Sequence, residues 1–498
     1  MLSEALRADM AAKGIDADLT LSILSDINRG LYDHVAPVQA RGVPAVDGTS
    51  IIPAGDAMVY RVDESAANER LAAFGLRLPR GLPRDGVMVV LDRSTLEDLG
   101  QRLYPLAAWG VLNGGSATSY ADRKKNAAIG PGVLDAVREG FELLAPLCEG
   151  RPKGITPAWL NPDGSPGESF LVVKMRIALL RAEAYVRRFG RPERPLLPFF
   201  QMTSAGTDDQ LTEAYRSWAG HPWLAPLIAS SETDPTRPRS AVQPLMAAFT
   251  HSSEGKPRRV FDRAYGNSDS AIALPGGHGQ GFRVLGDVYR GLLADGYRWA
   301  WLGNVDNAGF FPDPAELAVM ALSGAPAAFE FSYRTPVDVK GGILVVDQDG
   351  RRTVADLGQA ISADEAAALE ARGERILFNC ATGLFDLAAL VPMLDDIAAR
   401  LPVRLSDQDK DAGRYSQAEQ STWEVVGLLD SPLGFAVEKS ERFLSAKLLA
   451  ETVLASGAAD TAGLPPEVAD TAASLSAGLA RVLSGPCGLR LEGGRWRA

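Results

Sequence analysis

Three apolar segments of this chain each lead directly into a polar loop, and helical segments separate them. Residues 109–126, 194–210 and 297–307 begin with strand-like apolar runs and end in glycine, serine, threonine, asparagine, aspartate or basic residues. Amphipathic patterns predict helices over residues 165–190 and 282–293. Strands that alternate with helices are typical of the α/β class. Residues 341–357 indicate a hairpin with its turn at Asp349–Gly350, so we predict a mixed sheet with antiparallel as well as parallel strands.

The chain of 498 residues is longer than a single ordinary hydrophobic core, so we expect several domains. We predict a helical or mixed N-terminal region over residues 1–105 and a catalytic α/β domain over residues 106–400. A small C-terminal domain is expected over residues 401–498, and its alanine-rich last fifty residues are predicted to be helical.

Composition excludes several classes of function. A net charge of −11 argues against a nucleic-acid partner, because phosphate contacts need a clustered basic face. No stretch approaches the roughly 18 apolar residues of a membrane span, and the N-terminus lacks the apolar block of a signal peptide. Three cysteines without a CxxC pair and four histidines disfavour a zinc site. We therefore expect a cytoplasmic protein without a membrane partner, while the sequence leaves the oligomeric state open.

The first glycine loop is a candidate phosphate site. Gly114 and Gly115 follow an apolar run, and the basic residues Arg123, Lys124 and Lys125 come within ten positions. A glycine pair after a strand is commonly just a turn, and a basic run is commonly a solvated surface. Alternatively, successive backbone amides form a nest that attracts phosphate, and nearby lysines neutralise its charge.

A histidine set between glycines marks the second loop, "PGGHGQG" at residues 275–281. His278 can donate a hydrogen bond to a phosphate or a sugar hydroxyl. Gly277 and its neighbouring glycines would let the ligand approach the backbone closely. A plain turn does not explain the histidine, so we favour a substrate-binding interpretation.

The strand ending in "NVDN", residues 304–307, is a candidate metal site. Ligands of open α/β sheets bind beyond the carboxyl ends of the strands, where Asn304 and Asp306 would lie. Mg²⁺ takes one or two carboxylates and leaves its other positions to phosphates and water. A surface turn is the alternative. Lys340 and Lys447 would supply further positive charge, unless they only extend their amines into solvent.

The order of these pieces resembles the UTP–glucose-1-phosphate uridylyltransferase family, the UDP-sugar pyrophosphorylases. The resemblance covers about residues 105–450 and rests on "LNGG…RKKN", "PGGHG", "GNVDNAG", "RTPVDVKGG", "FNCATGLF" and "SERFLSAKLL". It implies a nucleotide-diphospho-sugar transferase fold with a Rossmann-like core. It also implies a Mg²⁺-dependent enzyme that converts a nucleoside triphosphate and a sugar 1-phosphate into an NDP-sugar and pyrophosphate, by default from UTP and glucose 1-phosphate.

On the nucleotide side, the resemblance implies that the backbone of Gly114 and Gly115 cradles the nucleotide. Lys124 or Lys125 matches the family's lysine beside the triphosphate, and their adjacency leaves both open. Lys447 matches a lysine that contacts phosphates.

On the sugar side, His278 in its glycine loop matches a histidine that contacts substrate. Asp306 matches the metal-binding aspartate, and Asn304 lies near the sugar phosphate. Lys340 precedes the matched double glycine, and Asn379 belongs to the family's sugar-contacting stretch.

The chain also departs from the family pattern. Ala117 replaces the third glycine of the first loop, and Cys380 and Ala381 replace the polar residues that follow Asn379. A glutamine that the family places near the uracil falls at Arg176. Since arginine pairs well with guanine, Arg176 indicates a base other than uracil. The loss of the polar residues after Asn379 indicates an acceptor other than glucose.

Two alternatives to the default reaction follow from these departures. One is a GTP-dependent guanylyltransferase of secondary metabolism that acts on a cyclitol phosphate, such as valienol 1-phosphate in aminocyclitol antibiotic biosynthesis. The other is a catalytically inactive protein that binds a nucleotide sugar. A serine hydrolase is disfavoured because no Gly-x-Ser-x-Gly motif is present.

Overall fold

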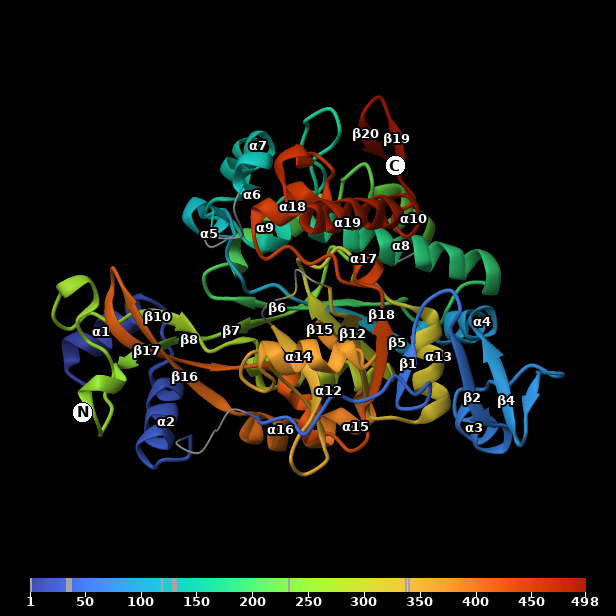
Figure 1. Cartoon of the computed structure of the whole chain (residues 1–498), viewed down its shortest axis with the longest axis horizontal. Helices are drawn as coiled ribbons and strands as arrows, with labels where there is room; N and C mark the ends of the chain where they lie inside the picture. Colours follow the sequence, from blue (N-terminus) through green and yellow to red (C-terminus); the bar gives the residue numbers. More distant parts are fainter. Residues whose placement is uncertain are drawn as a thin grey trace.

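A mixed β-sheet forms the centre of the molecule in the computed structural model (Figure 1), which describes residues 2–32, 38–117, 120–127, 132–231, 233–335, 338 and 341–498. Its strand order is β1-β18-β12-β15-β11-β5-β6-β7, and the hairpin β13–β14 joins it beside β15. The strands are β1 (Ile51–Pro53), β5 (Ala107–Leu112), β6 (Phe199–Ser204), β7 (Arg239–Gln243), β11 (Trp299–Asn304), β12 (Ala327–Tyr333), β13 (Gly342–Val346), β14 (Arg352–Asp356), β15 (Leu377–Asp386) and β18 (Leu433–Val437).

Strand β15 accounts for the mixed character of the sheet. It pairs antiparallel with β11 on one side and with β12 on the other, whereas β11, β5, β6 and β7 pair in parallel. The mixed α/β prediction and the hairpin over residues 341–357 are therefore confirmed. Strands β1 and β18 lie outside residues 106–400 yet belong to this sheet, and the domain boundaries themselves stay a prediction.

Helices cover both faces of the sheet (Figure 1). Alternate residues of a strand point to opposite faces. Trp109 and Trp301 accordingly pack into a core with α4 (Arg93–Leu103), α8 (Phe170–Phe189), α13 (Pro314–Ser323), α18 (Leu449–Ala455) and α19 (Pro466–Ser484). Ala108 and Phe200 face α11 (Gly281–Val284), α12 (Gly286–Ala294), α15 (Leu387–Leu390) and α16 (Leu394–Arg400).

Smaller units flank the sheet. The N-terminal helices α1 (Glu4–Ala12) and α2 (Ala17–Asn28) lie beside β8 (Leu245–Ala247), β9 (Phe249–Thr250), β10 (Ala273–Pro275), β16 (Val403–Lys410) and β17 (Gly413–Gln420). At the other end, β2 (Val59–Asp63), β3 (Arg84–Asp85) and β4 (Met88–Asp92) form an antiparallel sheet with α3 (Glu64–Ala72) nearby. The predicted helical N-terminal region is present.

Further helices extend the layer above the sheet in Figure 1. They are α5 (Arg123–Ala127), α6 (Val133–Ala136), α7 (Arg138–Cys148), α9 (Asp208–Trp218) and α10 (Ala225–Ser231), while α14 (Ala363–Ala371) and α17 (Lys439–Arg442) lie nearer the sheet. The C-terminal residues form α18, α19 and a hairpin of β19 (Arg490–Glu492) and β20 (Arg495–Arg497), which confirms the helical prediction for most of this segment.

The long helix α8 begins later than the sequence pattern predicts. Ser169 caps it by accepting a hydrogen bond from the Val172 amide, and Gly190 ends it as expected. Residues 157–169 instead fold back on themselves through the bridges Pro157–Ser169 and Leu160–Pro166. In the described part of the chain, no helix is both long and apolar enough to cross a membrane.

Candidate active site

Two loops of chemical interest emerge side by side from parallel strands. Asn304, the last residue of β11, pairs with Leu112, the last residue of β5. The Val305 amide then donates to the Leu112 carbonyl at 3.2 Å. The glycine loop after β5 and the Asp306 turn after β11 therefore leave the same edge of the sheet, as expected for a ligand site in an open α/β fold.

Lys153 joins these two loops. Its Nζ lies 2.5 Å from Asp306 Oδ2 and donates to the Ala446 carbonyl at 2.9 Å. Its backbone amide donates to the Gly115 carbonyl at 3.1 Å. The side chains of Lys153 and Asp306 are only 16% and 10% exposed. One lysine thus brings together the glycine loop, the candidate metal ligand and the segment that carries Lys447.

Sequence reasoning missed Lys153. The available signal was a lysine between Pro152 and Gly154, just before residues 157–169, the segment that leads into α8. The structure explains that glycine, because a Cβ at Gly154 would lie 2.5 Å from Asn113 Oδ1. A proline–lysine–glycine turn that packs against the first loop places the lysine amine inside the site.

The lysines predicted for this role lie elsewhere. Lys124 and Lys125 are exposed on the short helix α5, where neighbouring Arg123 forms an ion pair with Glu142 at 3.5 Å. Neither lysine is among the described residues that line the cavity of this region. The structure therefore does not bring Lys124 or Lys125 to Asp306. Lys340 lies outside the described residues.

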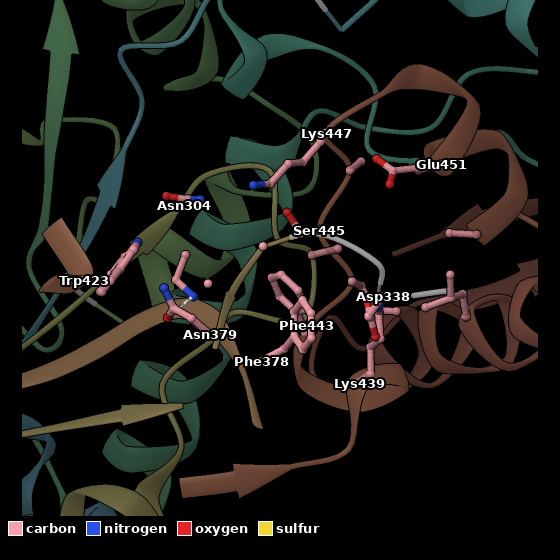
Figure 2. A pocket seen from close by; sticks show the side chains of 18 of the residues that line it. Asn304, Asp338, Phe378, Asn379, Trp423, Lys439, Phe443, Ser445, Lys447 and Glu451 are labelled. Carbon is pink, nitrogen blue, oxygen red and sulfur yellow. Dashed lines mark hydrogen bonds and ion pairs between the residues drawn. The ribbon is translucent and has the colours of Figure 1, made fainter. Parts of the chain in front are cut away.

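A cavity of about 620 Å³ opens beside this edge of the sheet (Figure 2). Of the predicted site residues, it is lined by His278, Asn304, Asn379 and Lys447. Figure 2 shows the Lys447 amine on the same side of the cavity as Asn304, with Asn379 and Trp423 below them. Gly114, Gly115 and Asp306 are not among its described lining residues, although Asn304 and Ala308 on either side of Asp306 are.

His278 is held as a neutral ring with one defined donor. The Thr422 amide donates to His278 Nδ1 at 3.0 Å, and Thr422 Oγ1 donates to the His278 carbonyl at 2.7 Å. Since Nδ1 accepts, the ring proton resides on Nε2. Burial, with the positive charge of Lys447 as a second cause, lowers the pKa of His278 to about 4. The side chain can therefore donate to a phosphate or hydroxyl oxygen without carrying charge itself.

The glycines around His278 have a packing role. Gly277 has φ +79°, and a Cβ there would lie 2.4 Å from the Gln420 carbonyl oxygen. The Gln420 amide donates to the Gly276 carbonyl at 3.0 Å. The turn thus presses against the end of β17, which gives a structural reason for Gly277 that does not require a ligand. Its contact with substrate stays a prediction.

Asn379 lines the cavity from a distorted part of β15. Its Oδ1 accepts from the Ala381 amide at 2.9 Å, and Ala381 has φ +52°. The pairing of β15 with β12 shifts register between Phe329 and Phe331, which is typical of a β-bulge. The distortion fixes the Asn379 side chain through its oxygen and leaves its amide group for other contacts.

A second ion pair lies across the cavity. Lys439 pairs with Asp338, which also accepts from the Thr335 hydroxyl at 2.6 Å (Figure 2). Glu451 lines the same region, and burial raises its pKa above the ordinary value. Lys447, in contrast, is exposed. The cavity therefore offers the exposed Lys447 amine in addition to an ion pair, Lys439–Asp338, whose charges balance each other.

Arg176 does not reach the cavity. Its Nε donates to the Cys487 carbonyl at 2.8 Å and its Nη1 to the Trp223 carbonyl at 3.0 Å. It is 8% exposed and is absent from the described lining residues. The expectation that Arg176 contacts the base is thus replaced by a structural role, in which it fastens α8 to the C-terminal segment.

Contacts from two sides hold the Asp306 turn. Lys174 Nζ donates to the carbonyls of Asn307 at 2.8 Å and Phe310 at 3.1 Å, and burial lowers the pKa of Lys174 to about 7. On the other side, the Asn307 side-chain amide donates to the Arg442 carbonyl at 2.9 Å. The turn that carries Asp306 is therefore fixed by α8 on one side and by the segment after β18 on the other.

Buried carboxyl groups balance Arg442. Its Nε donates to Glu330 Oε1 at 2.8 Å, and Glu316 lies close by. Burial and the adjacent Glu330 raise the pKa of Glu316 well above its ordinary value. The surroundings of Glu316 therefore favour its protonated form over its ionised form.

The donor set around Asp306 fits a magnesium ion that arrives with phosphates. Among the described residues there is no group of three or more His, Cys, Asp or Glu side chains that could hold a metal. Asp306 supplies a single carboxylate, with Lys153 as its partner. Mg²⁺ commonly binds with one or two carboxylates while phosphates and water complete its coordination. This arrangement suits a nucleotide-borne ion better than a metal cage made by protein alone.

Comparison with known proteins identifies the part of the chain that carries most of these features. Residues 258–458 match the family model described as UTP--glucose-1-phosphate uridylyltransferase. This range includes His278, Asp306, Asn379 and Lys447 but neither the first glycine loop nor Lys153.

Curated relatives bear the same description. A UTP--glucose-1-phosphate uridylyltransferase of Solanum tuberosum is 25% identical over 191 residues, which are 38% of this chain and 39% of that protein. A probable UTP--glucose-1-phosphate uridylyltransferase of Schizosaccharomyces pombe is 25% identical over 195 residues, 39% of this chain and 33% of that protein. The chain thus matches about two fifths of the length of the first of these relatives and a third of the second.

Solved structures show the same fold over most of the chain. The UDP-glucose phosphorylase from Trypanosoma brucei has a TM-score of 0.55 and 17% identity, and covers 93% of this chain and 80% of that one. A mutant UDP-glucose pyrophosphorylase from Leishmania major, in complex with UDP-glucose, has a TM-score of 0.52 and 18% identity, with 91% and 79% covered. The predicted fold is confirmed.

Proposed function

We propose that the chain is a sugar-1-phosphate nucleotidyltransferase, because residues 258–458 match the model of the UTP–glucose-1-phosphate uridylyltransferase family. It would convert a nucleoside triphosphate and a sugar 1-phosphate into an NDP-sugar and pyrophosphate. The contact between Lys153 and Asp306 supports this proposal most directly. It gathers a cation and a carboxylate at the strand edge where the glycine loop and the Lys447 segment meet.

The chemistry requires positioning and charge neutralisation. An oxygen of the sugar phosphate attacks the α-phosphorus of the nucleotide in line, a new P–O bond forms, and the bond to the β-phosphate oxygen breaks. The attacking phosphate is already ionised, so no general base is needed. Preorganised cations and hydrogen-bond donors then stabilise the charge that develops on the transferred group and on pyrophosphate.

The described side chains suit these tasks. Lys153 and Lys447 would neutralise phosphate oxygens, and His278 would donate its Nε2–H to a phosphate or sugar hydroxyl. Asp306 would hold Mg²⁺, whose charge would offset that of the nucleotide phosphates. Lys153 would then exchange Asp306 for a phosphate oxygen when substrate binds, which keeps its amine paired in both states.

UTP and glucose 1-phosphate are the default substrates by family. The argument for GTP depended on Arg176 contacting the base. The Arg176 guanidinium instead donates to backbone carbonyls, so no described residue now favours guanine. The replacement of the polar residues after Asn379 still supports testing a cyclitol phosphate as the acceptor. A cytoplasmic location and a place in secondary metabolism stay predictions.

A substrate panel tests the proposal. Purified protein with MgCl₂ would be assayed for pyrophosphate release from UTP, GTP, ATP and CTP, each with glucose 1-phosphate or valienol 1-phosphate. We expect turnover with at least one pair and a strict requirement for both substrates. Silence of every pair, together with tight NDP-sugar binding by calorimetry, would instead establish the inactive binding protein.

A further inference from the structure

Two neighbouring residues on the cavity wall carry buried polar atoms that have no partner among the described residues. Trp423 and Glu424 belong to the 3₁₀ helix of Thr422–Leu428, which follows β17, and both line the cavity. Figure 2 places Trp423 at the same end of the cavity as Asn379 and Asn304. Asn304 is the last residue of β11. Under the proposed function, the acceptor would bind at this end of the cavity.

The position of Trp423 is fixed by the histidine turn. Thr422 is held to His278 by the two hydrogen bonds described above, and the Trp423 and His278 ring centroids lie 6.3 Å apart. On its other side the indole packs edge-on against Phe329. Trp423 is 3% exposed, and its Nε1 has no hydrogen-bond partner among the described residues. Its donor is thus rigidly placed and unused.

Glu424 presents the complementary atom. Arg404 Nε and Nη2 both donate to Glu424 Oε1, at 2.9 and 2.8 Å. Within the described part of the chain, Oε2 is buried and has no partner. The side chain is 13% exposed, and burial raises the pKa of Glu424. Arg404 therefore orients the carboxyl group through Oε1, while Oε2 keeps no partner among the described residues.

A buried polar atom without a partner costs free energy unless a ligand satisfies it. Here the unused atoms are one donor and one acceptor, which together match hydroxyl groups, since a hydroxyl both accepts and donates. A site with such atoms rejects an analogue that lacks the hydroxyl, because the protein groups then stay unpaired in the complex.

We propose that Trp423 and Glu424 determine acceptor specificity by reading ring hydroxyls of the sugar or cyclitol phosphate. Trp423 Nε1–H donates to one hydroxyl oxygen, and Glu424 Oε2 accepts a hydrogen bond from the same or a neighbouring hydroxyl. The inference rests on the proposed function and names its acceptor class: a polyhydroxylated ring 1-phosphate rather than a simple phosphomonoester.

The test compares each acceptor with its monodeoxy analogues. The parent is glucose 1-phosphate or, where that is silent, valienol 1-phosphate, and kcat/KM is measured for wild type, Trp423→Phe and Glu424→Gln. We expect wild type to disfavour at least one deoxy analogue by about tenfold or more, the scale of one lost hydrogen bond. Trp423→Phe should lose about tenfold with the parent and lose that discrimination, while KM for the nucleotide stays within about twofold.

Trp301→Phe is the matched control, because Trp301 also has a buried Nε1 without a partner among the described residues but does not line the cavity. It should leave the deoxy discrimination unchanged, and thermal unfolding of all variants verifies folding. An active wild type whose discrimination survives in both Trp423→Phe and Glu424→Gln overturns this inference alone. A wild type that is silent with every substrate pair overturns it together with the proposed function.

Discussion

Lys153 Nζ lies 2.5 Å from Asp306 Oδ2, although 153 positions separate the two residues in the chain. The contact joins the turn at residues 152–154 to the loop after β11, and it is largely buried. A cation and a carboxylate that pair in the free protein can each take a new partner when phosphates and a divalent ion bind. The proposed function assigns this exchange to the step in which the substrates bind.

Replacing Lys153 by methionine should lower kcat by about a hundredfold or more, because a preorganised charge at the transferred phosphate is lost. Lys153→Arg should recover only part of the rate, since the planar guanidinium does not reproduce the compact amine. Steady-state kinetics with the best substrate pair provides the measurement. Lys124→Met and Lys125→Met are the controls, and rates near wild type are expected because both residues lie on the exposed helix α5. A strong loss in either control and none in Lys153→Met would restore the sequence-based assignment.

Asp306→Asn should reduce turnover at least about a hundredfold while the fold stays intact, as expected for a lost metal ligand. The amide removes the negative charge that holds the ion, so the Mg²⁺ concentration for half-maximal rate should rise. Rates across a magnesium titration, with circular dichroism as a check of folding, measure both effects. Full activity with an unchanged magnesium dependence would refute the metal assignment.

The imidazole of His278 should not titrate in the working pH range. Its pKa is lowered to about 4 from an ordinary 6.5, so the ring is neutral throughout that working range and continues to donate through Nε2. The folded state binds fewer protons than the unfolded chain between these values, so this residue makes the free energy of unfolding rise with pH across them. His278→Gln should remove that rise. A limb near neutral pH in the wild-type rate profile that disappears in His278→Gln would contradict the assignment.

Glu316 should contribute to stability in the opposite direction. Burial beside Glu330 raises its pKa well above 4.5, so the folded protein binds a proton that the unfolded chain releases as pH rises. Its contribution to stability is complete below the ordinary pKa and is lost as pH rises toward the higher pKa of the folded state. Urea unfolding at several pH values should therefore show wild type losing stability relative to Glu316→Gln between mildly acidic and alkaline pH. A difference that is independent of pH would show that Glu316 is ionised in the fold.

Gly277→Ala should destabilise the fold by about 1–3 kcal/mol, because the added methyl meets the Gln420 backbone and the residue has a positive φ. Gly266→Ala separates the two causes, since Gly266 has the same φ of +79° with open space around its Cβ position. Denaturant unfolding should give a clearly larger loss for Gly277→Ala. Equal losses would show that backbone conformation alone requires the glycine.

Sequence patterns predicted the parts of the fold that depend on local periodicity. The strand that ends at Asn304 and the hairpin about Asp349–Gly350 follow from alternation and turn residues, and both are present. The start of α8 was placed too early, because Ser165 and Pro166 resemble a helix start while residues 157–169 pair with one another. Bridges of this kind depend on tertiary contacts that local sequence does not report.

The candidate site shows the same division. Asp306 and His278 stand out because they interrupt apolar or glycine-rich runs, and their positions follow from the strands beside them. Lys153 does not stand out, because its partners are distant in sequence and two other lysines lie nearer the glycine loop. Arg176 falls where the family places a glutamine near the base, yet the C-terminal segment that occupies its guanidinium comes 311 positions later. Long-range pairing of charged groups was the information that the sequence lacked.

Exchange of labelled pyrophosphate into nucleoside triphosphate tests the central claim most directly. The protein would be incubated with UDP-glucose, Mg²⁺ and labelled pyrophosphate, and in parallel with GDP-glucose as the second nucleotide sugar. We expect label in the β- and γ-phosphates of the triphosphate with an equal release of sugar 1-phosphate, and loss of both in Lys153→Met. Absence of labelled triphosphate from the wild-type protein with both nucleotide sugars, or undiminished exchange in Lys153→Met, would contradict the account.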